Sequence, residues 1–461
     1  MPIKSFSEQR AYLDEKLASP ELFGGPLFNY MKIVQHGLLY ANNEDKSKLI
    51  RNYLSFPNWI IRLIYLVKSR KHRGNGFKPA LKEFIILEPG RWGKGSDGSK
   101  LSMYFNYPVA ILGREKCSII HLNSDPEIDG DFRLRDIIKG IGAPSISGKA
   151  KSILKEARRA MNSFHDSPHY SETEKRYVQS AFHIFLEEFL VYNALFSSQK
   201  SKVCLFFPHY HREGMIAAGK LNGIKMVELQ HGLIAENDLY YAYPEAIRSV
   251  SDKALFADKI LVMGDYWKDV LLRGSEYSES QIFCVGDYML TSGSDSVSKK
   301  KDQIFIGAQK NMASEYVAYT KQLLSIVETK YPNWTVVLKT HPLEKELDKY
   351  REIKHRQFTL KGNNASLTKL LDESRIQISI YSTTFFDALG KKVVNFSLQD
   401  YSAFSDYAED MVKENVAYPL AFQEDPIEKL NFVENSATPL LGRTRVYGKL
   451  QEKDFLGAVS C

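Results

Sequence analysis

The 461-residue sequence has few cysteines, no apolar leader and no long hydrophobic run. Its four cysteines are far apart and form no Cys-x-x-Cys pair, which argues against a disulfide framework and favours a reducing compartment. The N-terminus lacks the apolar stretch of a signal peptide. The longest apolar run, residues 59–67, is too short to span a bilayer and contains Arg62. We therefore expect a cytoplasmic protein.

Several signatures of cofactor and metal sites are missing as well. There is no Walker motif, no Gly-x-Gly-x-x-Gly fingerprint and no His/Cys spacing typical of zinc, so the sequence predicts no bound cofactor and no metal site. Neither a low-complexity tract nor an internal repeat appears, which argues against disorder and solenoid folds. The net charge of +7 suits an anionic ligand, an anionic membrane or simply a solvated basic surface. It is too small to predict nucleic-acid binding.

Short apolar runs alternate with helical stretches along most of the chain. Runs such as residues 202–210 end in Gly, Pro or polar side chains, a pattern typical of a parallel sheet with crossover helices. A Ser-, Gly-, Asp- and Lys-rich break at 291–303 separates two such sets. We therefore predict an α/β protein with two Rossmann-like domains, at residues 79–290 and 291–461, the second ending in a helical tail.

Residues 1–78 form a separate N-terminal extension that is predicted to be helical. Between residues 48 and 78, aromatic and aliphatic side chains are mixed with arginines and lysines. One interpretation is an interfacial amphipathic segment that touches the anionic inner face of the cytoplasmic membrane. The other is a helix packed on the body with a basic exposed end. Pro57 favours the second interpretation because it interrupts the helix.

The stretch around Glu228, “KMVELQHGLI”, is an apolar run that ends in polar side chains. If residues 226–230 form a strand, Glu228 and Gln230 share one face, and His231 begins the turn that follows. A buried carboxylate is unfavourable unless it is paired or functional, so these three side chains are candidate catalytic groups. The alternative is a core glutamate satisfied by neighbouring N–H groups, with His231 as a structural bridge.

Strand ends of the second domain carry groups suited to an anionic phosphate. Lys339 supplies a point charge, and His341 can donate a hydrogen bond from a turn that Pro342 makes rigid. Gln309 and Lys310 follow the first predicted strand of this domain. These residues are candidate donor-binding groups, and an ordinary exit from a strand is the alternative for each loop.

A third strand end, at residues 382–384, precedes a predicted helix. Ser382, Thr383 and Thr384 bring hydroxyl groups to a helix N-terminus, where free backbone N–H groups attract anions. Simple N-capping by Ser382 or Thr383 is the alternative, and capping is compatible with phosphate binding.

These strand ends resemble those of GT-B glycosyltransferases of bacterial surface-polysaccharide assembly. In the CMP-sugar-dependent sialyltransferases of this class, a His-Pro motif and a Ser-Ser/Thr motif hold the CMP phosphate and ribose. They match His341-Pro342 and Ser382-Thr383 here, in the same order. The element around Glu228 resembles the β-Kdo transferases of capsule and lipopolysaccharide synthesis. The acidic Asp/Glu-Gly catalytic motif of the sialyltransferases has no clear match, which shifts the catalytic prediction to Glu228.

The resemblance covers roughly residues 84–400. It implies a GT-B fold in which two domains face a cleft, and a metal-independent transferase that moves Kdo or a related nonulosonate from a CMP-sugar to a glycan or glycolipid acceptor. Positive groups around the phosphate would stabilise the departing nucleotide. Glu228 would act as a base with inversion or as a nucleophile with retention, and Gln230 and His231 would orient it or stabilise charge.

Two other functions stay open from the sequence. A polyol-phosphate transferase of teichoic-acid type would use CDP-glycerol as donor and His231 as base. A non-catalytic protein with a GT-B-like fold would serve as a scaffold in polysaccharide export.

Overall fold

The structure, a computed structural model, consists of two compact units. Unit 1 contains Met1–Ser7 and Ser292–Tyr447, and unit 2 contains Glu8–Thr291 and Gly448–Cys461. The described residues are 6–18, 28–42, 81–90, 92–94, 100–122, 132–134, 146–197, 200–236, 238–248, 253–289, 299–310, 312–342, 344, 346–362, 364–400, 405–436 and 439–460. The basic and aromatic segment at 48–78, for which membrane contact was one interpretation, lies outside these residues.

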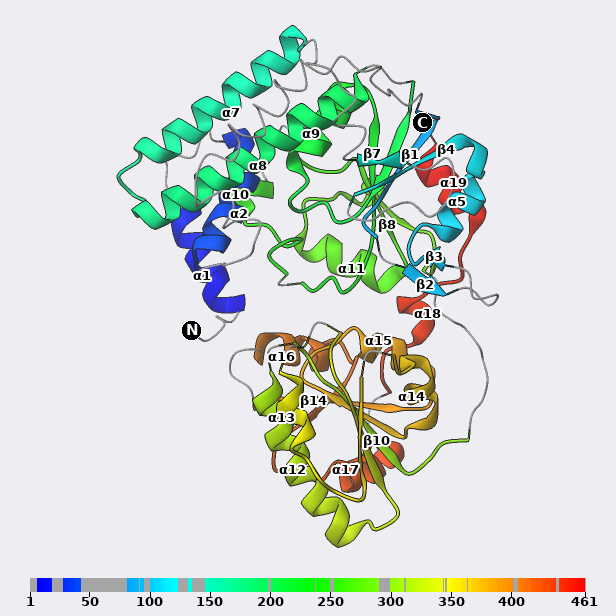
Figure 1. Ribbon diagram of the computed structural model, residues 1–461. Coiled ribbons are helices and arrows are strands. Elements are labelled where there is room, and N and C mark those ends of the chain that lie inside the picture. The colour runs from blue at the N-terminus through cyan, green and yellow to red at the C-terminus, as the bar shows by residue number, and fades with distance from the viewer. Residues whose placement is uncertain are drawn as a thin grey trace. The chain divides into compact units, whose positions relative to one another are not determined.

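Unit 2 is built on a parallel sheet of seven strands (Figure 1). Its strands are β1 (Phe84–Glu88), β4 (Cys117–His121), β5 (Phe132–Arg133), β6 (Val203–Phe206), β7 (Lys225–Leu229), β8 (Lys259–Val262) and β9 (Ile282–Cys284). Their order across the sheet is β5-β4-β1-β6-β7-β8-β9. The chain thus builds one half of the sheet, returns to the middle and builds the other half, as in Rossmann folds. The point of reversal, between β1 and β6, is where such sheets bind ligands.

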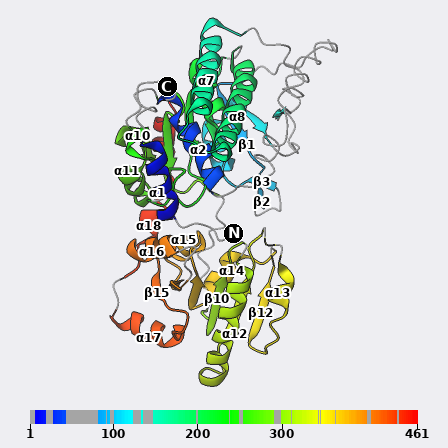
Figure 2. The same ribbon diagram turned by 90° about the vertical axis from the view of Figure 1, so that its left-hand side faces the viewer.

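Helices cover this sheet and extend beyond it. They are α1 (Phe6–Leu17), α2 (Met31–Asn42), α5 (Asn106–Leu112), α7 (Gly148–Asp166), α8 (Glu172–Phe196), α9 (Glu213–Leu221), α10 (Glu245–Arg248), α11 (Asp265–Gly274) and α19 (Glu452–Val459). Short 3-10 turns lie at Phe28–Tyr30, Arg114–Lys116 and Glu279–Gln281, and a separate antiparallel hairpin joins β2 (Trp92–Lys94) to β3 (Lys100–Ser102). Helix α8 contacts α2, α7 and α9, and Figure 2 shows α7 beside α8 on one flank.

The N-terminal helix α2 is part of the body of unit 2. Eleven of its twelve residues are buried, among them Lys32, Gln35 and His36. Gly37 makes the close approach to α8 possible, because a Cβ atom at this position would lie 2.5 Å from the Cα of Val178. Buried polar side chains on a closely packed helix need partners inside the protein, and these partners form part of the site described below.

Unit 1 has a second parallel sheet, of six strands. The strands are β10 (Gln303–Gly307), β11 (Thr335–Lys339), β12 (Phe358–Lys361), β13 (Ile376–Ser379), β14 (Val394–Leu398) and β15 (Tyr418–Leu420), in the order β12-β11-β10-β13-β14-β15. The helices are α12 (Ala313–Lys330), α13 (Leu347–Arg351), α14 (Leu367–Glu373), α15 (Thr384–Ala388), α16 (Ser405–Lys413), α17 (Pro426–Ser436) and α18 (Arg443–Val446). This is the Rossmann strand order, with the reversal between β10 and β13.

The two Rossmann-type sheets and the helices ahead of the first sheet confirm the fold class expected from the sequence. The C-terminal tail differs from the prediction, because residues 448–461 belong to unit 2 and not to the second domain. The backbone N–H of Gly448 donates to the carbonyl of Met263 at 2.7 Å, and that of Gln451 donates to Val285 at 3.0 Å. Gly286, at φ 87°, leaves room for this returning backbone. No helix among the described residues is long and apolar enough to cross a membrane.

Candidate functional site

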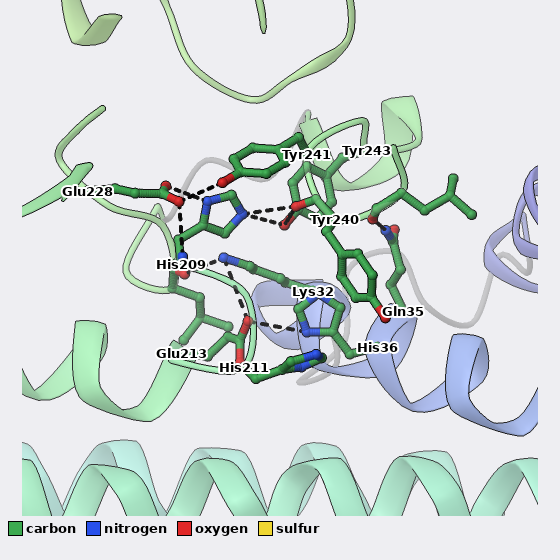
Figure 3. Close-up of polar contacts among 12 residues, drawn as sticks. Lys32, Gln35, His36, His209, His211, Glu213, Glu228, Tyr240, Tyr241 and Tyr243 are labelled. Carbon is green, nitrogen blue, oxygen red and sulfur yellow. Dashed lines mark hydrogen bonds and ion pairs between the residues drawn. The ribbon is translucent and has the colours of Figure 1, made fainter. Parts of the chain in front are cut away.

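Glu228 lies on β7, and its carboxylate is buried inside unit 2 (Figure 3). Oε1 accepts hydrogen bonds from the backbone N–H of His209 at 3.1 Å and from the hydroxyl of Tyr241 at 2.8 Å. Oε2 lies 2.6 Å from Nδ1 of His209 and accepts a bond from Tyr277 at 3.0 Å. Burial alone would raise the pKa of Glu228, but His209 and Tyr241 hold that pKa below its usual value. Because the Glu228 carboxylate has no exposed surface, a substrate cannot contact it in this arrangement. The role of Glu228 as base or nucleophile stays a prediction.

Gln230 and His231, the other predicted catalytic residues, have different environments. Gln230 is fully buried, accepts a bond from the backbone N–H of Met263 at 3.0 Å and donates to the carbonyl of Gly232 at 2.9 Å. These contacts tie the end of β7 to the end of β8. His231 is partly exposed, and its Nε2 lies 3.1 Å from the hydroxyl of Tyr210. Of the three predicted groups, His231 is the one with exposed surface, while its Nδ1 is buried.

The loop between β6 and α9 was not predicted as part of a site, yet it brings His209, Tyr210 and His211 to the reversal point of the sheet. His209 is fully buried, and its Nε2 lies 3.1 Å from the hydroxyl of Tyr243. His211 takes up a left-handed conformation, at φ 62°, and its Nδ1 lies 2.5 Å from the hydroxyl of Tyr40 on α2. The sequence signal is present in retrospect, since three aromatic or imidazole side chains directly follow an apolar run.

Helix α2 supplies a second set of buried ionisable groups to this loop (Figure 3). Lys32 and His36 are 1% and 2% exposed, and Glu213, at the start of α9, is 6% exposed. Oε1 of Glu213 lies 3.7 Å from Nζ of Lys32 and 3.2 Å from Nδ1 of His36. Burial lowers the pKa of both Lys32 and His36, while the contacts with His36 and then Lys32 hold the pKa of Glu213 down against its burial. The loop is thus fixed by buried ionisable partners that lie far away in the sequence.

A small pocket adjoins this cluster, with room for about one water molecule. Nε2 of His36 is buried and has no hydrogen-bond partner among the described residues. The pocket is lined by Ile33, His36, Tyr40, Ala181, Ile184, His211 and Glu213. A bound water is the simplest partner for the imidazole nitrogen.

In unit 1, the predicted donor-binding residues stand on the loops that follow three adjacent strands, β11, β10 and β13. Gln309, after β10, is buried and its Oε1 accepts a hydrogen bond from the hydroxyl of Tyr316 on α12. The same hydroxyl lies 3.2 Å from Oγ of Ser379 and accepts a bond from the N–H of Ile380 at 3.2 Å. Tyr316 therefore ties together the two loops at the reversal point, and Lys310 is exposed beside them.

Ser382, Thr383 and Thr384 follow β13, and their hydroxyls make fewer cap interactions than expected. Oγ of Ser382 accepts bonds from the N–H of Thr384 at 3.2 Å and from its hydroxyl at 2.9 Å. Thr383 is the N-cap of α15 but its side chain makes no capping bond. The expected N-capping is thus limited to the Ser382 turn, and α15 has only five residues. Thr383 is exposed and available to a ligand.

Lys339 is the last residue of β11, and His341 follows this strand in the same part of unit 1. Both side chains are partly buried, and Pro342 next to His341 is exposed. Burial lowers the pKa of Lys339. The pKa of His341 is also lowered, first by burial and then by the positive charges of Lys310 and Lys339. Glu344 acts on His341 in the opposite direction, and an anion bound beside His341 would be attracted by Lys310 and Lys339.

The spacing of these loops suits a phosphate-containing ligand. Because β11 and β13 flank β10, their ends are separated by two strand spacings, or about 10 Å. No group of His, Cys, Asp or Glu side chains in the described part of the chain is arranged to hold a metal ion. The positive charge near these loops comes from the side chains of Lys310 and Lys339 themselves.

Comparisons with known proteins give a fold likeness only. No protein-family model and no curated protein matches the chain. It is similar to the UDP-GlcNAc 2-epimerase of Methanocaldococcus jannaschii, at 14% identity over 80% of this chain and 97% of that one, with a TM-score of 0.45. It is also similar to a glycosyltransferase from Rickettsia africae, at 10% identity over 81% of this chain and 95% of that one, with a TM-score of 0.41. A third similar structure is the α,α-trehalose 6-phosphate synthase of Burkholderia multivorans, at 9% identity over 82% of this chain and 93% of that one, with a TM-score of 0.41. With TM-scores below 0.5, these likenesses say nothing of what this chain binds.

Proposed function

We propose that this protein is a glycosyltransferase that takes a nucleotide-sugar donor in unit 1 and activates its acceptor with groups of unit 2. The observation that carries the proposal is the gathering of Lys310, Lys339, His341 and Ser382 on loops of three adjacent strands around the reversal point of the unit 1 sheet. A nucleotide leaves as an anion, so preorganised positive groups at its phosphate lower the barrier to transfer. These side chains provide such groups without a metal.

The donor we propose first is a CMP-linked sugar, Kdo or a related nonulosonate, with a bacterial surface glycan or glycolipid as acceptor. The support for this choice is the pair of motifs His341-Pro342 and Ser382-Thr383, which occupy the loops after β11 and β13. The name of the Methanocaldococcus jannaschii epimerase gives UDP-GlcNAc as the compound on which that protein acts, and UDP-sugars are the second class to test.

On the acceptor side, His231 is the proposed general base. It is partly exposed at the carboxyl end of β7, and the Tyr210 hydroxyl next to Nε2 can fix the orientation of the ring. Nδ1 would then be the basic nitrogen, and acceptor binding would have to uncover it because it is buried here. Glu228 would then act as a positioning residue, because it holds His209 and thereby the loop that carries Tyr210. Direct attack by Glu228 would require this network to open.

The exposure of His231 also favours the polyol-phosphate transferase as a second candidate, since that reaction would use a histidine base with CDP-glycerol. The two candidates share the anion-binding loops and differ in the group that is transferred, which is a sugar in one case and a phosphate-linked polyol in the other. Turnover products therefore distinguish them.

The deciding experiment is a donor screen with the full-length protein, with products identified by mass spectrometry. The donors are CMP-, UDP- and GDP-sugars and CDP-glycerol, each offered with a mixture of glycan acceptors. Consumption of a nucleotide-sugar that is lost in His231→Ala and at least about tenfold slower in Tyr210→Phe supports the proposal. Consumption of CDP-glycerol alone supports the second candidate. Absence of turnover and of nucleotide binding would leave the scaffold as the better account.

A further inference from the structure

Helix α7 has one face directed into unit 2 and a strongly basic face directed away from it. It begins with Ser147 as N-cap, whose hydroxyl accepts a bond from the N–H of Ala150 at 3.2 Å. The helix packs against α8, and both views show it as an outer helix of its unit (Figures 1 and 2). Its buried residues are Ala150, Leu154, Ala157, Ala160 and Phe164.

Four cationic side chains form a stripe on the opposite face. Lys151, Lys155, Arg158 and Arg159 are all exposed and are spaced by four, three and one residues. At 3.6 residues per turn this spacing puts them within about a third of the helix circumference, facing away from the buried residues. None of the four has an ion pair or hydrogen bond to a side chain within the part of the chain that the structure describes. The acid on this face, Glu156, accepts a bond from Ser152 at 2.7 Å.

This arrangement opposes the stability of the helix. Like charges at i and i+4, such as Lys151 with Lys155 and Lys155 with Arg159, repel each other along the helix surface. The first turn contains no acidic residue, and Lys149 and Lys151 place positive charge at the end where the helix dipole is already positive. The like-charged neighbours and the positive charge at the N-terminus both destabilise the helix, and neither improves its packing. Such unfavourable local choices are typical of a functional surface.

Some other exposed cations of the protein are paired with nearby acids. Lys330 lies 2.9 Å from Glu428, Lys349 lies 2.6 Å from Glu346, and Arg351 lies 2.8 Å from Asp348. The four cations on α7 have no such acidic partner among the described residues, and a negatively charged partner would supply one.

We infer that the stripe of Lys151, Lys155, Arg158 and Arg159 is a docking surface for an anionic lipid bilayer. The stripe extends over about 12 Å along the convex surface of one helix, so it suits a broad planar charge better than a single phosphate group. Its exposed face presents no Phe, Tyr or Trp side chain on which a base could stack, which disfavours single-stranded nucleic acid. The attraction is electrostatic, because the apolar residues of α7 are committed to the interior.

This surface is distinct from the segment at 48–78, which the sequence alone suggested for membrane contact. It also does not depend on the proposed transfer reaction, since lipid binding can be measured without nucleotide or acceptor. Failure of one proposal therefore leaves the other standing.

The test is co-sedimentation of the full-length protein with vesicles of phosphatidylcholine alone and of phosphatidylcholine with about 30% phosphatidylglycerol. We expect binding to the anionic vesicles only, and release when salt is raised from about 0.1 M to about 0.5 M because screening shortens the reach of the charges. The variant K151Q/K155Q/R158Q/R159Q should bind at least about tenfold more weakly. Its thermal midpoint should be equal to or above that of the wild type, because the repulsion is removed.

A charge-matched control separates the stripe from net charge. The variant K321Q/K354Q/K369Q/K453Q removes four exposed lysines elsewhere on the protein and should bind the anionic vesicles like the wild type. Three results would overturn the inference: no preference of the wild type for anionic vesicles, equal binding by the α7 variant, or an equal loss in the control variant. Displacement from the vesicles by an equal phosphate concentration of duplex DNA would instead identify nucleic acid as the partner.

Discussion

His209 and Glu228 form a fully buried pair in which Nδ1 of the histidine lies 2.6 Å from Oε2 of the glutamate. The backbone N–H of His209 donates to the same carboxylate, so one glutamate fixes both the ring and the main chain of the loop after β6. The hydroxyl groups of Tyr241 and Tyr277 donate the remaining hydrogen bonds to the Glu228 carboxylate. A buried carboxylate with this set of donors is stable only while every donor stays in place.

Glu228→Gln should therefore destabilise unit 2. The amide has one acceptor oxygen and adds an NH2 group that would face the donors of His209, Tyr241 or Tyr277, leaving buried groups unpaired. We expect a loss of about 3–5 kcal/mol in the free energy of unfolding, measured by urea denaturation. Glu279→Gln, which removes an exposed partner of Lys268, is the control and should leave the urea midpoint unchanged. Equal stability of Glu228→Gln and the wild type would contradict the described network.

The buried histidines predict a loss of stability in mild acid. Burial lowers the pKa of His211 to about 3 and lowers that of His36, whereas both residues titrate near 6.5 in an unfolded chain. The unfolded state therefore takes up more protons below pH 6.5, and their contribution to stability, complete above that pH, is lost as pH falls toward 3. The slope is up to about 1.4 kcal/mol per pH unit for each histidine. Glu213 and Glu228, whose pKa values are lowered, add a further loss only near pH 4 and below.

Thermal melts between pH 7.5 and pH 4.5 check this dependence. His211→Gln should flatten the fall of the melting temperature between pH 6.5 and 4.5, because the uncharged amide takes up no proton. His165→Gln, on the exposed face of α7, is the matched control and should keep the wild-type slope. If His211→Gln and the wild type have parallel profiles, His211 is not held in its neutral form.

Two helical glycines should respond oppositely to alanine. Alanine gains up to about 1 kcal/mol in helix propensity over glycine. At Gly37 the new methyl group would lie 2.5 Å from the Cα and 2.9 Å from the backbone N of Val178, and overpacking against a backbone costs about 1–3 kcal/mol. At Gly457 on α19, nothing lies within 4 Å. Urea denaturation should show Gly37→Ala destabilised and Gly457→Ala neutral or stabilised, and a stabilised Gly37→Ala would contradict the packing of α2 on α8.

Most strands of both sheets could be predicted from the sequence because parallel strands buried on both faces are continuous apolar runs, as in β6 and β10. The edge strand β15 lies in the tail that was predicted to be helical. The place of α2 could not be predicted, since the partners of its polar side chains are remote in the chain. Tyr40 and His211 are 171 residues apart, and Lys32 and Glu213 are similarly distant. The C-terminal tail was assigned to the wrong unit for the same reason, because its contacts with Met263 and Val285 are long-range.

The candidate site was predicted unevenly. Polar side chains at strand ends located the loops of Lys339, His341 and Ser382, because parallel strands bring their carboxyl ends to one edge. The exposure of Glu228 could not be predicted from the alternation of side chains along the strand. That alternation tells on which face of the sheet a side chain lies, but not which other residues cover it. The pairing with His209 depends on the loop after β6, whose conformation the sequence does not determine locally.

The account depends most on nucleotide binding by the strand-end loops of unit 1, and calorimetric titration with CMP, UDP, GDP and CDP measures it directly. At least one nucleotide should bind the wild type, and both His341→Ala and Lys339→Met should weaken that binding at least about tenfold, because each removes a charge-assisted contact. Lys354→Met, an exposed lysine of the same unit, should leave the affinity unchanged. Nucleotide binding that is undetectable in the wild type, or equal in the wild type and both variants, would contradict the proposed donor site.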